Sequence, residues 1–467
     1  SRDSTVAAAY TYLGQFIDHD ITKMEAVNDG VASNMEAAFF AAMAGRDVSP
    51  MPEEHFAAIV NRRVPSLNLD SVLSSAAPRT RGVLDIGPVT TENAGNRPVL
   101  PFTEPAELLL LHDLPRNDPT NSNEELDRRA KIGDPRNDEN LAVQQLHVAF
   151  LRAHHQLRKT VKLSEAEADL HLQHLFQRMV IDDFLPQVCD AGVVGATLEH
   201  SARFYQPTHA RPYMPLEFSV AAFRFGHSMV RDGYDYNSVF PRATLGQMFS
   251  FTAFAGNIGL PEFGVGPFNT LPHNWIIDWS RWLPHQGATS NHAKKIDTLI
   301  ADHLGKLPQH SGVIGGDGVN ILAVRNLVRG LLLGLPTGQA VASRVAEIYN
   351  ALPGITRPIA PLTQAEILAV AQSAGQAQAD ALQQGGFDTR TPLWYYMLAE
   401  AAHGGGSQLG PVCSVVVAST LIELVKLASR NVLAYPDFVP QIPTEEDGKV
   451  KLVDLLRFAK VFPEAGA

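Results

Sequence analysis

Residues 13–22 read Leu-Gly-Gln-Phe-Ile-Asp-His-Asp-Ile-Thr, and their apolar residues recur at the spacing of a helix. In such a helix Gln15, Asp18 and His19 stand at i, i+3 and i+4 and share one face. Asp20 lies about 100° further round the helix, so it faces a different partner. The segment therefore predicts that an amide, a carboxylate and an imidazole meet at one site. A solvated helix face is the alternative that this segment alone leaves open.

A second histidine lies far along the chain in a helix-like apolar run. Residues 221–230 read Ala-Ala-Phe-Arg-Phe-Gly-His-Ser-Met-Val, which places Arg224 about one helical turn before His227. A single histidine in an apolar run is usually a core residue. It becomes a candidate ligand only when other segments supply partners for it.

Two further segments complete a pattern that belongs to a known family. They are Arg136-Asn-Asp-Glu139 and Asn326-Leu-Val-Arg329-Gly, the second followed, after three intervening residues, by Gly334-Leu-Pro336. In this order the four segments resemble the motifs of the animal-type haem peroxidases, in the peroxidase–cyclooxygenase superfamily. Matching positions run from about residue 12 to about residue 430. The resemblance implies a haem b derivative as cofactor, hydrogen peroxide as oxidant and an oxoferryl intermediate.

On the distal side, the resemblance assigns three side chains to the reaction with hydrogen peroxide. His19 would take a proton from the oxygen that binds iron and return it to the leaving oxygen, which a neutral imidazole can do near neutral pH. Arg136 would stabilise the developing negative charge, because a guanidinium stays protonated. An ion pair within the charged loop 117–140 is the alternative for Arg136. Gln15 would hold a small anion or a water molecule beside His19.

On the proximal side, the resemblance makes His227 the ligand of the haem iron. Asn326 would orient the ring N–H of His227, as partners behind metal ligands do. Arg224 and Arg329 would pair with the haem propionates. Because an amide accepts hydrogen bonds more weakly than a carboxylate, His227 should gain little anionic character.

Asp18 and Glu139 match the two carboxylates that form ester bonds to the haem in this family. Myeloperoxidase has a third link, from a methionine directly after the glutamate, which withdraws electrons from the porphyrin. Asn140 stands there in this chain, so that link cannot form. The expected substrates are therefore iodide, thiocyanate, bromide and phenolic donors, with chloride a poor substrate.

The resemblance also implies a calcium site, formed by Asp20 and oxygen ligands of the loop Val-Pro-Ser-Leu-Asn-Leu-Asp-Ser-Val at 64–72. The candidate loop ligands are Ser66, Asn68 and Asp70. Two positions depart from the family pattern, because valine replaces the first threonine and Asn68 stands where an aspartate is usual. A metal-free loop held by hydrogen bonds is the alternative.

Composition and periodicity predict a mostly α fold. The chain has 467 residues, 45% of them hydrophobic, so it can bury a large core, and no linker or repeat divides it. We therefore expect one large helical domain over residues 1–467, with long loops and little strand. Helical periodicity is clearest in five segments, at 139–163, 165–185, 318–334, 364–384 and 412–434.

Charge and cysteine content narrow the setting. The net charge of −11, without basic runs, disfavours nucleic acid as a partner, and no apolar stretch predicts a transmembrane segment. The oligomeric state cannot be read from the sequence. The chain begins at Ser1 without a visible signal peptide, which suggests a trimmed, secreted or extracytoplasmic product. Cys189 and Cys413 are expected to be free buried thiols, and so few cysteines favour a bacterial-type member.

Two other functions were weighed against a peroxidase. A fatty-acid dioxygenase of the same superfamily needs a tyrosine three residues before the proximal histidine, and Arg224 occupies that position. A non-catalytic haem-binding module would have no use for Gln15, His19 and Arg136.

No zinc-binding pattern accompanies the three histidines of segment 139–163. We therefore interpret those three as ordinary helix residues: His147, His154 and His155.

Overall fold

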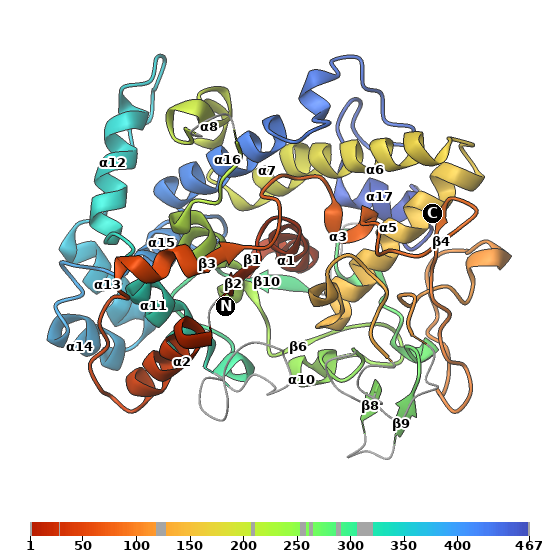
Figure 1. Cartoon of the computed structure of the whole chain (residues 1–467), viewed down its shortest axis with the longest axis horizontal. Helices are drawn as coiled ribbons and strands as arrows, with labels where there is room; N and C mark the ends of the chain where they lie inside the picture. The colour runs from red at the N-terminus through yellow and green to blue at the C-terminus, as the bar shows by residue number, and fades with distance from the viewer. Residues whose placement is uncertain are drawn as a thin grey trace.

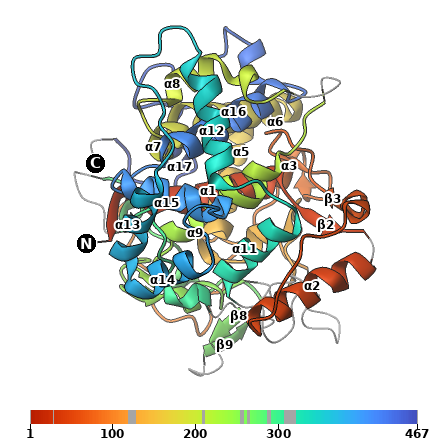
Figure 2. The same cartoon turned by 90° about the vertical axis from the view of Figure 1, so that its left-hand side faces the viewer.

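The chain is predominantly helical, with two-stranded sheets and long connections between the helices (Figure 1, Figure 2). The computed structural model describes residues 2–27, 29–117, 128–206, 211–252, 258–260, 265–285, 291–305 and 321–465. A large hydrophobic cluster extends from Val6 near the N-terminus to Phe462 near the C-terminus. The mostly α fold that the sequence predicts is thus confirmed. Within the described part of the chain, no helix combines the length and the apolar character needed to cross a membrane.

Helix α1 (Ala9–Ile21) carries the distal motif through the middle of the molecule (Figure 1). All of its residues are buried except Gly14 and Gln15, which are partly exposed. The ring of Phe16 stacks on Phe150 of α5, with the ring centroids 4.8 Å apart. This packing fixes the rotation of α1 and therefore the direction in which its polar face points. Strand β1 (Asp3–Ala7) precedes α1 and pairs antiparallel with β10 (His292–Lys294).

Two long helices, α5 and α6, support α1. The N-terminus of α6 has a capping box in which Ser164 and Glu167 satisfy each other's backbone N–H groups. The predicted helix 165–185 has the right extent, but its last turn widens into a π-helix before the chain continues as α7. Asp183 in that π-turn accepts a hydrogen bond from Tyr10 of α1 at 2.8 Å. The bounds are α5 (Leu141–Lys159), α6 (Glu165–Met179), the π-helix η4 (Val180–Phe184), α7 (Leu185–Val188) and α17 (Leu452–Phe458), which packs on α5.

The segment that leads to His227 is not one regular helix. It passes through a π-turn and a 3₁₀ turn before a short α-helix, and irregular turns of this kind often occur at functional sites. Helices α15 and α16 pack behind it, and Glu400 of α15 accepts N–H bonds from Val412 and Cys413 at the start of α16. The bounds are η7 (Glu217–Ala221), η8 (Ala222–Arg224), α9 (Gly226–Met229), α11 (Leu322–Leu332), α15 (Leu393–His403) and α16 (Pro411–Lys426).

Three of the predicted helical segments are shorter or divided. Helix α11 covers only part of 318–334, and residues 318–320 lie outside the described part of the chain. The segment 364–384 splits at Gly375, whose φ of 150° is open to glycine but rarely to other residues. The segment 412–434 continues past α16 only as a 3₁₀ turn. The bounds are α13 (Gln364–Ala374), α14 (Gln376–Gln384) and η14 (Val432–Ala434). Helix α12 (Gly338–Asn350) lies between the first two segments.

A smaller hydrophobic cluster joins α2 (Asp29–Met43) to α11 at one side of the molecule (Figure 2). Met35 and Phe39 of α2 pack there with Val328 and Leu332 of α11. Strands β2 (Met24–Ala26) and β3 (Ile59–Asn61) form an antiparallel pair that borders this cluster. The 3₁₀ helix η1 (Glu53–Ala58) directly precedes β3.

The remaining elements are short and lie in the connections. Three antiparallel pairs of strands occur here: β4 (Arg79–Thr80) with β5 (Val83–Leu84), β6 (Gly233–Tyr234) with β7 (Ala243–Thr244), and β8 (Ile258–Leu260) with β9 (Val265–Phe268). The helical turns are α3 (Asp70–Leu73), α8 (Val194–Glu199), α10 (Leu245–Met248), η2 (Ala106–Leu108), η3 (Pro135–Asp138), η5 (Ser201–Arg203), η11 (His273–Trp275), η12 (Trp279–Arg281) and η13 (Asp302–Gly305).

Candidate active site

The polar face of α1 meets the segment 136–139, as the motifs predict. Nε2 of His19 lies 3.5 Å from Oε1 of Glu139, and the Gln15 amide donates a short hydrogen bond to the same oxygen. Asp18 is buried, and its carboxylate accepts from the Thr22 hydroxyl at 2.9 Å. The Gln15 amide and the His19 imidazole therefore meet at Glu139, whereas the Asp18 carboxylate contacts Thr22 and, at 3.3 Å, Arg224.

Two residues that the sequence did not single out orient His19. Nδ1 of His19 lies 2.9 Å from Oδ1 of Asn137, and Nδ2 of Asn137 lies 3.0 Å from Nδ1 of His147. Burial lowers the pKa of His147 to about 3, so its ring is neutral and can accept from the Asn137 amide. The Asn137 oxygen then accepts from Nδ1–H of His19, which leaves the lone pair on Nε2 of His19. His147 is therefore part of the site network and not an ordinary helix residue.

Arg136 lies at the C-terminal end of α1, held by several partners. Its Nε and Nη2 pair with the two carboxylate oxygens of Asp134 at 3.0 and 2.8 Å. Nη2 also donates to the backbone oxygens of His19 and Thr22, at 3.0 and 2.6 Å. Arg136 thus forms an ion pair, with Asp134, as the alternative interpretation of the sequence expects. This ion pair lies at the candidate site, because the same guanidinium contacts the backbone of His19. Its orientation is fixed before any substrate arrives.

His227 is paired with Asn326, as the proximal motifs predict. The Asn326 amide lies 2.8 Å from Nδ1 of His227, with Asn326 coming from α11. Burial, together with the nearby positive charge of Arg224, lowers the pKa of His227 to about 3, so the imidazole is neutral and able to bind a metal. The atom that faces Nδ1 is Nδ2 of Asn326. A half-turn of this amide exchanges its nitrogen and oxygen, and Oδ1 would then accept from Nδ1–H and leave Nε2 to bind iron. An asparagine side chain therefore contacts Nδ1 of both His19 and His227, through its oxygen at His19 and through its nitrogen at His227.

Three arginines gather where the expected haem propionates would lie. Nη1 of Arg224 is 3.3 Å from Oδ2 of Asp18, which joins the proximal segment to α1. Burial, together with the positive charges of Arg224 and Arg325, lowers the pKa of Arg329 to about 9. Nε of Arg329 is buried and has no hydrogen-bond partner among the described residues. The positive charge of the three arginines, together with the unpartnered Nε–H of Arg329, fits the binding of two propionates. Arg325 was not predicted, although it lies one helical turn before Arg329 on α11.

Asn140, at the position of the linking methionine in myeloperoxidase, has a structural role in this chain. It is the N-cap of α5, and its side-chain oxygen accepts from the Val143 N–H at 3.0 Å. Its Nδ2 donates to Oε1 of Gln15, also at 3.0 Å. Asn140 therefore both begins α5 and fixes the Gln15 amide beside His19.

The predicted calcium ligands do not fit a calcium ion. The two carboxylate oxygens of Asp20 accept N–H bonds from Leu69 and Ser71, at 3.0 and 2.9 Å. Nη2 of Arg63 lies 3.6 Å from the Asp20 carboxylate, so a guanidinium supplies positive charge beside it.

The loop oxygens are occupied as well. The Ser66 hydroxyl accepts from the Asn68 amide at 2.6 Å, and the side-chain oxygen of Asn68 accepts from Gln173 at 3.3 Å. Asp70 begins the short helix α3. No cluster of three or more His, Cys, Asp or Glu side chains suited to a metal occurs in the described ranges. The alternative of a loop held by hydrogen bonds fits this geometry.

If the Arg63 guanidinium compensates the negative charge of Asp20 in place of a calcium ion, the Arg63→Ala variant should be much less stable than the wild-type protein. Asp20 is completely buried, and breaking a buried ion pair leaves an uncompensated charge, so we expect the free energy of unfolding to fall by about 3 kcal/mol. The matched control is Arg62→Ala, because Arg62 is exposed and its surface pair with Glu25 should contribute less than about 1 kcal/mol. Urea denaturation with and without EDTA provides the measurement. Tightly bound calcium in the purified protein, or a large loss of stability in EDTA, would contradict this role for Arg63.

The two cysteines and the other histidines of α5 lie outside this network. Cys189 and Cys413 are free and buried, as expected, and burial raises the pKa of the Cys189 thiol to about 12. Nε2 of His154 contacts Asp169 at 3.1 Å, while its Nδ1 accepts the Leu84 N–H. His155 is partly buried. These groups support the fold.

Comparison with known proteins agrees with this geometry. The family model for the animal haem peroxidases matches residues 79–250, which include Arg136, Glu139, Arg224 and His227. Peroxidase A from Dictyostelium discoideum has a similar fold, with a TM-score of 0.56 and 16% sequence identity over 99% of this chain and 86% of that chain. No curated protein sequence matches the chain. Residues 79–250 thus match the animal haem peroxidase family, and the chain as a whole shares its fold with a peroxidase.

Proposed function

We propose that the chain uses hydrogen peroxide to oxidise small anions, namely iodide, thiocyanate and bromide, together with phenolic donors. The observation that carries this proposal is the pair of histidines whose Nδ1 atoms are each held by an asparagine. One of them, His19, leaves Nε2 for proton transfer, and the other, His227, leaves Nε2 for a metal. A module that only stored haem would need the second arrangement but not the first.

The residues that would hold the haem come from two parts of the chain. His227 would bind the iron, and the cluster of Arg224, Arg325 and Arg329 would bind the propionates. When bound, the haem supplies the iron that takes up the peroxide oxygen and the electrons that this reaction consumes. The orphaned Nε of Arg329 is the group that most clearly requires an anionic partner.

Proton transfer on the distal side belongs to His19. Because Asn137 holds Nδ1–H, Nε2 can accept a proton from hydrogen peroxide and then donate it to the departing oxygen. The guanidinium of Arg136 favours the negative charge that develops there, and its fixed position means that it need not reorganise. While the Glu139 carboxylate is free, its negative charge 3.5 Å from Nε2 of His19 competes with hydrogen peroxide chemistry by favouring a proton held on that nitrogen. An ester bond between Glu139 and the haem would remove that competition.

The substrate preference can be tested with halides. Without the methionine link, and with Asn140 fixed as the cap of α5, we expect oxidation of iodide, thiocyanate and bromide but little oxidation of chloride. The experiment compares halogenation of monochlorodimedone with chloride and with bromide at equal concentration between about pH 5 and 7, beside iodide oxidation. Efficient chlorination would contradict the preference. Turnover of phenols without any halide would restrict the function to organic donors.

Covalent attachment of the haem gives a further prediction. After exposure to hydrogen peroxide, acid–butanone should leave haem on the protein, bound through Asp18 and Glu139. The Glu139→Gln variant should lose one of the two links, and the double variant with Asp18→Asn should release all of its haem. Mass spectrometry of haem-bearing tryptic peptides identifies the linked residues. Complete extraction of the haem from the wild-type protein after turnover would show that no ester forms.

A further inference from the structure

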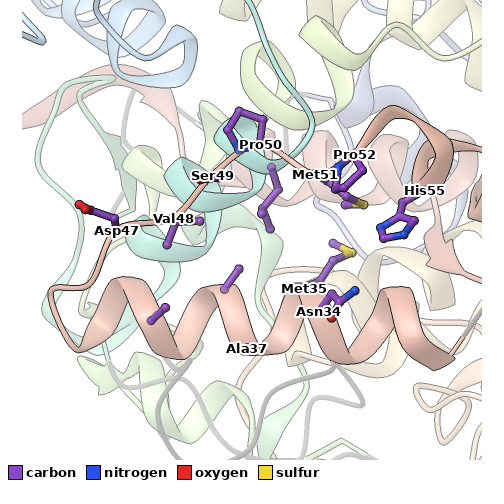
Figure 3. A pocket seen from close by; sticks show the side chains of 13 residues that line it. Asn34, Met35, Ala37, Asp47, Val48, Ser49, Pro50, Met51, Pro52 and His55 are labelled. Carbon is purple, nitrogen blue, oxygen red and sulfur yellow. The ribbon is translucent and has the colours of Figure 1, made fainter.

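A cavity of about 360 Å³ lies between α2, the segment that follows it and the C-terminal end of α11 (Figure 3). Met35 and Ala38 of α2, Met51, and Leu332 of α11 give it mostly apolar walls, and His55 lines one side. Its volume falls within the range of small-molecule sites. None of the catalytic or haem-binding residues described above lines it, although α11 reaches both places.

The local sequence explains why this space stays open. Ala37, Ala38 and Ala41 present only methyl groups from α2 toward the cavity. The opposite wall is tied to α11 by the Met51 N–H, which donates to the backbone oxygen of Leu332 at 2.9 Å. Small side chains on one side and an anchored backbone on the other keep the two walls apart.

The lining carries four polar side chains, from Asn34, Asp47, Ser49 and His55, and the polarisable sulfur atoms of Met35 and Met51. Nδ1 of His55 is buried and has no hydrogen-bond partner within the described ranges. A buried nitrogen left without a partner is costly, so a ligand hydroxyl that donates to it would be favoured. The thioethers of Met35 and Met51 lie beside the His55 ring (Figure 3). Methionine sulfur makes favourable contacts with aromatic rings.

The charge of the lining excludes the anionic substrates. The lining contains no lysine or arginine, while Asp47 contributes a carboxylate. Iodide, bromide and thiocyanate would therefore find no cation in this cavity. We propose that the cavity binds a neutral single-ring phenol, with its ring between Met35 and Met51 and its hydroxyl on His55.

The position of the cavity suggests that it serves the phenolic donors. Leu332 follows Arg329 by three residues, a rise of about 4.5 Å along α11, so the bound phenol lies near the arginine assigned to a propionate. The phenol would give one electron to the peroxide-oxidised enzyme and its hydroxyl proton to Nδ1 of His55, and would leave as a phenoxyl radical. This donor role rests on the proposed function, whereas the binding itself does not.

Binding is tested on the whole haem-loaded protein without peroxide. With methyl-¹³C methionine labelling, 4-methylphenol should shift the NMR signals of Met35 and Met51. His55→Leu should weaken binding of 4-methylphenol by about 3- to 10-fold, the effect of one hydrogen bond, but should leave toluene binding unchanged. Ala38→Trp fills the cavity and should abolish the shifts. Ala365→Trp, at an exposed position of α13, is the matched control and should retain them.

Kinetics then test the donor role separately. Ala38→Trp should raise KM for 4-methylphenol at least 5-fold while leaving iodide oxidation unchanged. Absent shifts, or shifts that survive Ala38→Trp, would overturn the binding site. Binding with unchanged phenol kinetics in Ala38→Trp would overturn the donor role. If no donor of any class is oxidised, the proposed function fails, while the binding result stands.

Discussion

The variant His227→Ala is expected to purify without haem, or with haem whose spectrum is grossly altered. Burial, together with the positive charge of Arg224, lowers the pKa of His227 to about 3, so its imidazole is neutral, and its Nδ1 lies 2.8 Å from the Asn326 amide. On the proposed assignment, removing it deletes the iron ligand, and the arginines proposed to bind the propionates cannot replace that bond. The measurement is the ratio of Soret to protein absorbance after reconstitution with excess haemin.

The control for this variant separates loss of the ligand from loss of the fold. His303→Ala removes a partly exposed histidine far along the chain and should bind haem as the wild-type protein does. The far-UV circular dichroism of both variants should remain helical. A normal Soret band and full activity in His227→Ala would remove His227 from the haem site.

The second large effect is expected for His19→Ala. Its reaction with hydrogen peroxide should slow by about 10²- to 10⁴-fold, which is the usual contribution of general acid–base catalysis. Haem content should stay normal, because His19 is not assigned to the iron or to the propionates. Stopped-flow absorbance of the Soret band at increasing peroxide concentration gives the second-order rate constant.

A companion variant tests how His19 is oriented. Asn137→Leu removes the hydrogen bond at Nδ1 but keeps the imidazole, so the rate with peroxide should fall by about 10-fold, less than in His19→Ala. Asn137 acts through His19 and is a positioning residue. Peroxide kinetics in His19→Ala that match the wild type would remove His19 from the mechanism, and unchanged kinetics in Asn137→Leu would remove only its orientation by Asn137.

The sequence predicted those parts of the site that depend on local spacing. Gln15, Asp18 and His19 share a face because helix geometry alone requires it, and Asn326 and Arg329 are one turn apart for the same reason. The general helical character followed from periodicity. The resemblance to a known family then indicated which distant segments meet, which spacing could not show.

The parts that were missed depend on partners distant in sequence. The motif at 136–139 gave no role to Asn137, whereas the structure places its side chain between His19 and His147. Arg63 lay outside the quoted calcium loop by one residue, so its pairing with Asp20 could not be anticipated. The break at Gly375 illustrates the same limit, because periodicity continued across a glycine whose backbone conformation ends the helix.

The most direct test is the absorption spectrum of the purified wild-type protein before and after one equivalent of hydrogen peroxide. We expect a Soret band, a rapid change in that band when peroxide is added, and its return when iodide is added. A protein that takes up no haem, or whose Soret band does not respond to peroxide, would contradict the assignment of His227 and His19 to a peroxidase site.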